Sequence, residues 1–336
     1  MVALLKKHDP SARSLMVRLP NWVGDVVMCL PALNHLAALG APLVICGRAW
    51  AKPLIQNVQY LEFVTLKGSI WYDARAVQQA VLPNMVAFTF PDSFSSALVF
   101  RLVGLPTMGY RDDGRSWLLK WPIDKPLQPL HAVEKWFYLA ESAKKTWQKT
   151  MIAQRCTSNA FDKLPRHINL ALMTRQVSQA RALLLKAHIV NQPYILIAPT
   201  ATGLHRGQVK VWPYFSALTQ FLQQEGFCVV ACPPKHERTQ ALTQAPTITL
   251  LEPSDLGTFA ALARSAALVI CNDSGVSHIS AAVGANQITL FGVTDPNQTG
   301  PWSEVALRIG SLGHWPKLEE VLQIAKDRLA ILRPLG

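Results

Sequence analysis

A glycine and an aspartate stand where the first apolar run of the sequence gives way to a helical pattern. Gly24 and Asp25 follow the strand-like run Leu15–Leu19. Glycine allows a tight turn at this place, and a carboxylate there can accept a proton from a substrate hydroxyl. On these two residues alone, an aspartate at a helix start more commonly caps the helix and is stabilised by the helix dipole. Asp25 is therefore a candidate general base, with a helix cap as the structural alternative.

A second polar loop follows a strand-like run in the other half of the chain. It carries the hydroxyl of Thr200, a glycine, Lys210 and then Pro213, which is typical of a first helical turn. Hydroxyl donors, a cation and a helix N-terminus together suit a phosphate group. The chain has neither a Walker A motif nor a GxGxxG fingerprint, so ATPase and nicotinamide-binding functions lose their main support. Taken alone, Lys210 could equally be a solvated surface lysine.

A third loop repeats this chemistry. Asp273, Ser274 and Gly275 form a turn into a helix, and His278 comes one turn later. Backbone donors at such a helix start would bind a pyrophosphate together with the serine hydroxyl, and the carboxylate could accept from a sugar hydroxyl. The structural alternatives are a capping serine and a packed core histidine. Since a long polar loop also follows the next strand-like run, the second half presents two phosphate-binding turns at one edge.

Strand-like and helical runs alternate along the chain, which is the pattern of parallel sheets with crossover helices. In the first half we expect strands at Leu15–Leu19, Pro42–Cys46, Phe63–Leu66 and Val86–Phe90, and helices near Val26–Leu39, Asp73–Val81 and Ser93–Val103. In the second half we expect strands at Tyr194–Pro199, Cys228–Cys232, Thr247–Leu251, Leu268–Cys271 and Gln287–Phe291. Helices are expected there over Thr174–Ala187, Tyr214–Glu225, Leu256–Ser265, Val276–Val283 and Leu318–Leu332.

These elements predict an α/β protein with two doubly wound, Rossmann-like domains. In sheets of this kind ligands bind beyond the carboxyl ends of the strands, where the three polar loops fall. A basic stretch without a clear strand period separates the halves, so we expect an N-terminal domain of residues 1–168 and a C-terminal domain of residues 169–336. The last helix either stays with the second domain or packs back on the first.

The composition narrows the classes of protein further. Lys and Arg outnumber Asp and Glu by 33 to 21, for a formal net charge of +12. This excess indicates an acidic partner: nucleic acid, an anionic membrane surface or a phosphorylated substrate. Nucleic-acid binding would explain the charge but not the NDSGVSH turn, so we expect no nucleic-acid partner. No apolar run reaches the ~18–20 residues of a membrane helix, no signal peptide is recognisable, and no CxxC pair indicates zinc or redox chemistry.

Four stretches of the sequence share a wider pattern. They are RLPNWVGDVVM, LPNMVAFTFPDSFSSALVFRLVGLPTMGYR, KVWP and NDSGVSHISAAVGANQITLFGVTDP. Together they resemble glycosyltransferase family 9, the bacterial ADP-heptose:lipopolysaccharide heptosyltransferases, and the NWVGD element is most similar to the second-heptose enzymes. The resemblance implies a GT-B fold, in which two Rossmann-like domains face a central cleft. It also implies an inverting transfer of heptose to the inner core of lipopolysaccharide, without metal or cofactor, with the ADP-heptose as a substrate.

The resemblance also assigns roles to residues by position. Asp25 takes the place of the general base that deprotonates the acceptor hydroxyl. A glutamate after a second-half strand resembles a ribose-binding residue, although a surface glutamate is an equally good account of it. The other donor-side positions resemble diphosphate contacts, a pyrophosphate-binding turn and its neighbouring carboxylate. The implied donor-binding residues are Thr200, Lys210, Glu237, Asp273, Ser274, Gly275 and His278.

The acceptor implied by the resemblance is the lipid A–Kdo core. Its phosphates and carboxylates suit a basic protein, and Arg111 and Arg115 are candidates for contact with it, against the alternative of a solvated basic face. The expected location is cytoplasmic, peripheral on the anionic inner face of the inner membrane. Two other functions are kept: a family-9 transferase that uses another nucleotide sugar on another surface glycan, and a nucleotide-sugar-binding protein without turnover.

Overall fold

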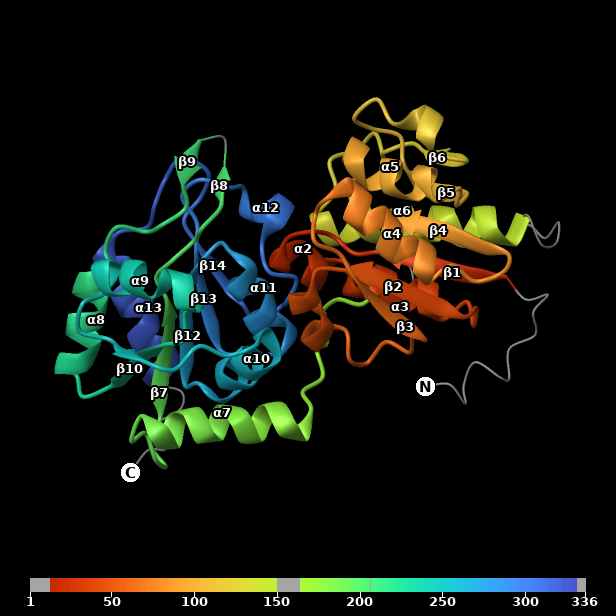
Figure 1. The fold of residues 1–336 in the computed structure, drawn as a ribbon. Coiled ribbons are helices and arrows are strands. Elements are labelled where there is room, and N and C mark those ends of the chain that lie inside the picture. Colours follow the sequence, from red (N-terminus) through yellow and green to blue (C-terminus); the bar gives the residue numbers. More distant parts are fainter. Residues whose placement is uncertain (1–12, 150–163, 206, 331–336) are drawn as a thin grey trace. The chain divides into compact units, whose positions relative to one another are not determined.

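The computed structural model describes residues 13–149, 164–205 and 207–330. The chain divides between Pro165 and Arg166 into two compact units, whereas the sequence analysis places the boundary after residue 168. We call them the N-terminal unit and the C-terminal unit and describe each by itself. Each contains a six-stranded sheet whose described pairings are all parallel (Figure 1).

The sheet of the N-terminal unit has the strand order β3-β2-β1-β4-β5-β6. Its strands are β1 (Ser14–Arg18), β2 (Leu43–Gly47), β3 (Glu62–Thr65), β4 (Met85–Thr89), β5 (Thr107–Tyr110) and β6 (Trp121–Ile123). The helical segments are α2 (Val23–Met28), α3 (Leu30–Ala37), η1 (Ala49–Leu54), α4 (Ile70–Gln79), α5 (Phe94–Leu102), η2 (Ser116–Leu118) and α6 (Ala132–Lys149). On one face of the sheet, Val77 of α4 and Phe100 of α5 join a buried cluster with Met16 and Val44. Helices α3 and α6 pack against each other.

The sheet of the C-terminal unit repeats this plan with the order β11-β10-β7-β12-β13-β14. Its strands are β7 (Tyr194–Ala198), β10 (Cys228–Ala231), β11 (Thr249–Leu250), β12 (Leu268–Asn272), β13 (Gln287–Leu290) and β14 (Leu307–Ile309), and β8 (Leu204–His205) pairs with β9 (Gln208–Val209) in a small hairpin. The helical segments are α7 (Thr174–Lys186), α8 (Phe215–Gln224), η3 (Lys235–Glu237), α9 (Arg238–Gln244), α10 (Leu256–Ser265), α11 (Gly275–Ala282), α12 (Pro296–Thr299) and α13 (Leu318–Ala330).

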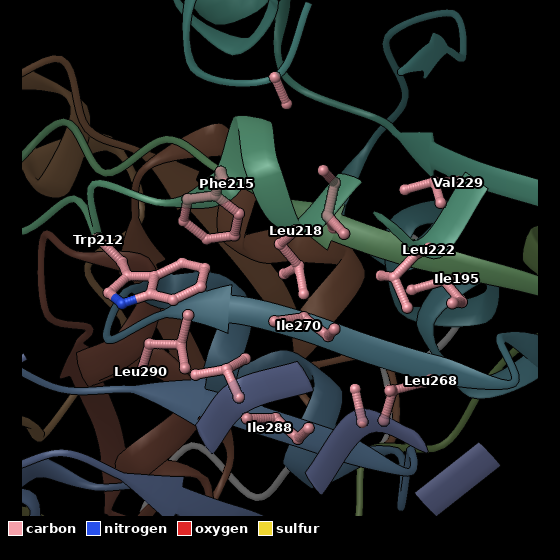
Figure 2. Close-up of a cluster of buried hydrophobic side chains, with 14 of the residues drawn as sticks. Ile195, Trp212, Phe215, Leu218, Leu222, Val229, Leu268, Ile270, Ile288 and Leu290 are labelled. Atoms are coloured by element: carbon pink, nitrogen blue, oxygen red, sulfur yellow. The ribbon is translucent and has the colours of Figure 1, made fainter. Parts of the chain in front are cut away.

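A buried apolar cluster covers one face of this second sheet (Figure 2). Because side chains alternate across a strand, Ile195 and Ile270 lie on the same side as Leu218 and Leu222 of α8. Burying one such side chain stabilises a fold by about 1.5–3 kcal/mol. The apolar positions of α13 join the same cluster, so its buried face belongs to the core of the C-terminal unit, where the sequence analysis left open packing on the first domain.

In each sheet the strand order reverses beside the first strand in the sequence. The reversal lies between β1 and β4 in the N-terminal unit and between β7 and β12 in the C-terminal unit. Two consecutive loops diverge at such a point and leave room beyond the carboxyl ends of the strands, where ligands bind in open α/β sheets. Asp25 lies in α2, which follows β1, and the loops after β7 and β12 carry Thr200 and Asp273.

Most predicted elements are confirmed within the described residues. The last two residues of the helix predicted over Leu318–Leu332 lie outside them. The helix predicted over Val26–Leu39 is divided at Cys29 into α2 and α3. Pro31 lies in the first turn of α3, and proline has no amide hydrogen and a ring that clashes with the carbonyl four residues back, so an uninterrupted helix is excluded. The sequence analysis did not predict β5, β6 and β14, which have only 3 or 4 residues each, nor helix α6.

Candidate active-site residues

Four neighbouring strands of the C-terminal unit end in the polar loops that the sequence singled out. Strands β10, β7, β12 and β13 are adjacent in the sheet, so the segments after their carboxyl ends meet at one edge. These segments carry Glu237, Thr200, Asp273 and Thr294. The structure brings them into two hydrogen-bonded groups, one around Glu237 and one around Asp273.

The first group joins Thr200 to Glu237. The Thr200 hydroxyl donates a hydrogen bond of 2.5 Å to Oε2 of Glu237, and the glutamate side chain is only 14% exposed. The other carboxylate oxygen, Oε1, lies 3.6 Å from Nε2 of His236. Glu237 is therefore a held carboxylate at the sheet edge, and the alternative of an ordinary surface glutamate is wrong.

The second group centres on Asp273. Nζ of Lys210 donates to its backbone carbonyl at 2.9 Å and lies 4.0 Å from its Oδ2, which also accepts a hydrogen bond of 2.5 Å from the Thr294 hydroxyl. The Lys210 side chain is 21% exposed, so the alternative of a solvated surface lysine is also wrong. An ammonium group has three donors, and this one stands beside the turn into α11.

The segment that carries Lys210 is fixed from two sides. The backbone amide of Trp212 donates to Oδ1 of Asn272 at 2.9 Å, and its indole nitrogen donates to the carbonyl of Pro316 at 2.8 Å. The Trp212 ring is fully buried in the core cluster, where Figure 2 shows it beside Phe215. Anchoring two residues downstream thus sets the place of Lys210.

Ser274, Gly275 and His278 lie where the sequence predicts, on the turn into α11. Ser274 is the N-cap residue, but its side chain makes no capping hydrogen bond, and its hydroxyl oxygen is buried without a partner among the described residues. Gly275 begins the helix, and His278 is buried one turn later. Because the Ser274 side chain makes no capping bond, the interpretation of this serine as a simple cap is wrong. A buried hydroxyl without a partner is costly unless a ligand or water supplies one.

In the N-terminal unit, Asp25 is the third residue of α2 and lies half-buried. The N-cap residue is Trp22, so the interpretation of Asp25 as the cap is wrong. Asp25 lines a pocket of about 680 Å³, within the ~300–1,000 Å³ range of small-molecule sites. The pocket is lined by Pro20, Asn21, Trp22, Asp25, Pro91, Asp92, Ser93, Tyr110, Lys125, Pro126, Leu127, Gln128, Pro129, Ala132, Lys135 and Trp136.

Comparison with known proteins decides the family of the chain. Its residues 75–326 match glycosyltransferase family 9 (heptosyltransferase). The chain belongs to glycosyltransferase family 9. This family-9 glycosyltransferase is 26% identical over 317 residues to lipopolysaccharide heptosyltransferase 2 of Escherichia coli K12, and the match covers 85% of each chain. It is 25% identical over 318 residues to lipooligosaccharide heptosyltransferase 2 of Haemophilus influenzae, again over 85% of each chain.

Solved structures give the same picture of the fold. E. coli ADP-heptose lps heptosyltransferase II is similar with a TM-score of 0.73 at 22% identity, over 95% of this chain and 99% of that one. E. coli heptosyltransferase WaaC with ADP is similar with a TM-score of 0.65 at 19% identity, over 94% and 99% of the two chains. The predicted α/β fold of the GT-B kind, with two Rossmann-like domains, is confirmed.

The two arginines predicted to contact the acceptor have different surroundings in the family-9 glycosyltransferase. Arg111 is exposed, and its Nε lies 3.4 Å from a carboxylate oxygen of Asp124. Arg115 is fully buried, so its guanidinium is closed to an acceptor and the prediction for it is wrong. It is instead a structural residue, whose Nε donates to the carbonyl of Tyr110 at 2.9 Å and whose second nitrogen donates to that of Pro91 at 2.6 Å. Burial lowers the pKa of Arg115 to about 10.

Besides Arg115, Lys125 connects loops around the pocket through ion pairs. Nζ of Lys125 donates to a carboxylate oxygen of Asp92 at 2.9 Å and also to one of Asp112, so one ammonium bridges the loops after β4, β5 and β6. Partial burial alone would lower the pKa of Lys125, but the hydrogen bonds to the two aspartates raise it above its usual value. The Tyr110 hydroxyl ties α6 to the same region by donating to the carbonyl of Lys135 at 2.5 Å.

Thr294, Trp22 and Lys125 were not predicted as site residues. Thr294 lies in a polar loop that the sequence did single out, four residues after the end of β13. Trp22 lies four residues after the end of β1, in the NWVGD element, so its position was a comparable signal. Lys125 follows β6, a strand too short to be predicted, and the two aspartates that it binds come from other loops.

Over residues 13–149, 164–205 and 207–330, no cluster of three or more His, Cys, Asp or Glu side chains is arranged to hold a metal ion. Within the same ranges no helix has the length and apolar character needed to cross a membrane.

Proposed function

We propose that this family-9 glycosyltransferase transfers a heptose from ADP-heptose to the inner core of lipopolysaccharide, with inversion at the anomeric carbon and without a metal ion. The relatives named above, which are heptosyltransferases of lipopolysaccharide and lipooligosaccharide, support the sugar and the acceptor. The observation that carries the proposal is the pair of polar groups at the edge of the second sheet, around Glu237 and Asp273.

Different residues at this edge suit different parts of an ADP-sugar. The Glu237 carboxylate is an acceptor for the vicinal hydroxyls of the ribose, and the Thr200 hydroxyl holds it in place. The Lys210 ammonium and the unpartnered Ser274 hydroxyl are donors for the diphosphate at the start of α11. In this proposal Lys210 supplies the positive charge that a metal ion supplies in other transferases.

The proposed chemical step is a single displacement at the anomeric carbon. The acceptor hydroxyl loses its proton to the Asp25 carboxylate, and its oxygen forms a bond to the anomeric carbon of the donor. The bond from that carbon to the diphosphate breaks, and the electron pair leaves with the ADP. Negative charge grows on the leaving diphosphate in the transition state, so fixed donors at Lys210 and Ser274 accelerate the reaction rather than only binding the substrate.

We further propose that the enzyme works at the cytoplasmic face of the inner membrane as a peripheral protein. The support is the net charge of +12 together with an acceptor that lies in an anionic leaflet. Of the two candidate arginines, only the exposed Arg111 stays in the proposal as a contact for the acceptor.

The substitution Asp25→Asn tests the mechanism. Asparagine has nearly the same size but cannot take up a proton at neutral pH, so turnover should fall on the order of 10²–10⁴-fold while ADP affinity and melting temperature stay close to the parent values. Glu62→Gln, at an exposed carboxylate of β3 that does not line the pocket, is the matched control and should keep transfer close to the parent rate. A parent-like rate in Asp25→Asn would exclude it as the base.

A deletion strain tests the substrates. Mass spectrometry of its lipopolysaccharide should show a core truncated by one heptose and everything attached beyond it. Loss of a different sugar would reject the heptose donor, and an intact core with a changed second glycan would reject the acceptor.

A further inference from the structure

An exposed tryptophan stands beside the proposed base. Trp22 is 67% exposed and occupies the N-cap position of α2 without a side-chain capping bond. Serine, threonine, aspartate and asparagine are preferred at N-caps, where a residue without a capping oxygen typically costs about 1 kcal/mol. Neither capping nor core packing therefore accounts for a tryptophan here. Natural proteins break such local preferences mainly at functional sites.

The position of Trp22 ties it to the reaction. Trp22 is the N-cap residue of α2, with an extended backbone, and Asp25 is the third residue of the same helix. Both line the pocket of about 680 Å³. A group that contacts the indole inside this pocket therefore shares the cavity with the Asp25 carboxylate.

The charged side chains of the pocket indicate which kind of ligand group can lie against Trp22. Its lining holds two carboxylates, Asp25 and Asp92, and two ammonium groups, Lys125 and Lys135. Lys125 is already bridged to Asp92 and to a further aspartate outside the lining, so no surplus of positive charge faces the pocket. An isolated phosphate finds little attraction in such surroundings.

The rest of the lining is apolar or uncharged. Proline rings, a leucine and a second indole, that of Trp136, form much of the wall. Such walls suit a molecule with an apolar face and a polar rim, which describes a sugar ring: its C–H groups lie on an aromatic face while its hydroxyls reach polar side chains.

We propose that Trp22 is the platform for the sugar ring of the acceptor in this pocket and so sets the affinity for the acceptor whose hydroxyl Asp25 deprotonates. The inference rests on the proposed function, because it assumes that Asp25 activates an acceptor. Trp22 contacts the acceptor only, so it sets acceptor affinity and leaves the donor untouched.

Kinetics with separate variation of the two substrates tests this role. The acceptor probe is the deacylated core oligosaccharide from a strain that lacks this gene. Trp22→Ala should raise the KM for this oligosaccharide on the order of 10- to 100-fold, as loss of a central aromatic contact does, and leave the KM for the donor unchanged. Trp22→Phe keeps an aromatic face and should recover most of the affinity. It also covers the case in which the alanine variant folds poorly.

Two other tryptophans of the N-terminal unit provide matched controls. Trp71 and Trp117 are 77% and 69% exposed and do not line the pocket, so their alanine variants should keep the parent KM for the acceptor. An unchanged acceptor KM in Trp22→Ala, or an equal rise in Trp117→Ala, would overturn the proposal. A fall in kcat alone would overturn it too, since it would mean that Trp22 acts through the geometry of α2.

Binding without donor separates this inference from the proposed function. Saturation-transfer NMR with simple methyl glycosides at millimolar concentration should show ring contacts with the parent enzyme that disappear in Trp22→Ala and persist in Trp117→Ala. If the parent fails to glycosylate the core oligosaccharide but this difference is seen, the proposed function fails and the platform stands. Transfer by the parent with no such difference in any assay rejects the platform alone.

Discussion

The substitution Arg115→Met measures how much the buried guanidinium contributes to the free energy of unfolding of the N-terminal unit. Besides its bonds to Tyr110 and Pro91, the guanidinium donates to the carbonyl of Ser93 at 3.2 Å and to the hydroxyl of Ser96 at 2.9 Å. It therefore joins two places, the end of β5 and the loop after β4. A hydrogen bond from a charged group contributes about 1.5–3 kcal/mol, so two independent attachments contribute about 3–6 kcal/mol.

Part of this contribution is offset. The fall in the pKa of Arg115 to about 10 has burial as its largest cause, which means that the folded chain bears a cost for holding the charge there. Methionine fills a similar volume without that cost. In the methionine variant the carbonyls of Pro91 and Ser93 still accept hydrogen bonds from the Ser96 hydroxyl, so they are not left without a donor. We therefore expect a net loss of about 2–4 kcal/mol in the free energy of unfolding of the N-terminal unit.

Scanning calorimetry measures this loss. For a unit of this size the melting temperature should fall by about 5–15 °C, since each kcal/mol corresponds to about 2–4 °C. The melting temperature of Arg115→Lys should lie between those of the parent and of Arg115→Met. An ammonium keeps the charge, but it lacks the planar fork that reaches both loops. The reasoning is refuted if Arg115→Met melts like the parent while its KM for the acceptor rises, because that outcome would place the guanidinium on the acceptor.

Three further predictions concern the donor and the membrane. Lys210→Met should weaken ADP binding about 10- to 100-fold by calorimetry, because it removes a cation beside the diphosphate, and unchanged affinity in a folded variant would remove Lys210 from the site. Glu237→Ala should weaken ADP about tenfold or more but leave inorganic pyrophosphate unaffected, and an equal loss for both would contradict a ribose contact. Sedimentation with anionic vesicles should show attachment that disappears between about 0.1 and 1 M salt, as the Debye length shrinks from about 10 to about 3 Å. Equal binding to neutral vesicles would contradict the role of charge.

Alternating strand-like and helical runs allow the sequence to predict the two Rossmann-like domains, but helix α6 was not predicted. Its buried residues Val133, Phe137 and Ala140 recur at helical spacing, so the signal was present among the charged residues around them. Strands of three or four residues such as β6 are too short to show an alternation, and only the neighbouring strand defines them.

The donor-side candidates could be assigned to one edge of the sheet because they lie in the segments that follow parallel strands, and such strands bring their carboxyl ends together. Lys210 and Asp273 are 63 positions apart, but the strands that precede them in the sheet, β7 and β12, are neighbours. The β8–β9 hairpin between β7 and Lys210 was not predicted. Arg115 carried no comparable signal. Arginine is mostly exposed in proteins, and the carbonyl groups that bury this one belong to residues up to 24 positions earlier, which meet it only in the folded unit.

The identical strand order of the two sheets has a consequence for how substrate choice is encoded. Equivalent segments carry unlike residues: the segment after the first strand contains Asp25, within α2, in one unit and Thr200, within a loop, in the other. Under the proposed function, substitutions around Asp25 alter acceptor use and those around Thr200 alter donor use, and the two sets of residues belong to different compact units. On that proposal a chimera joined after Pro165 takes its donor preference from one parent and its acceptor preference from the other.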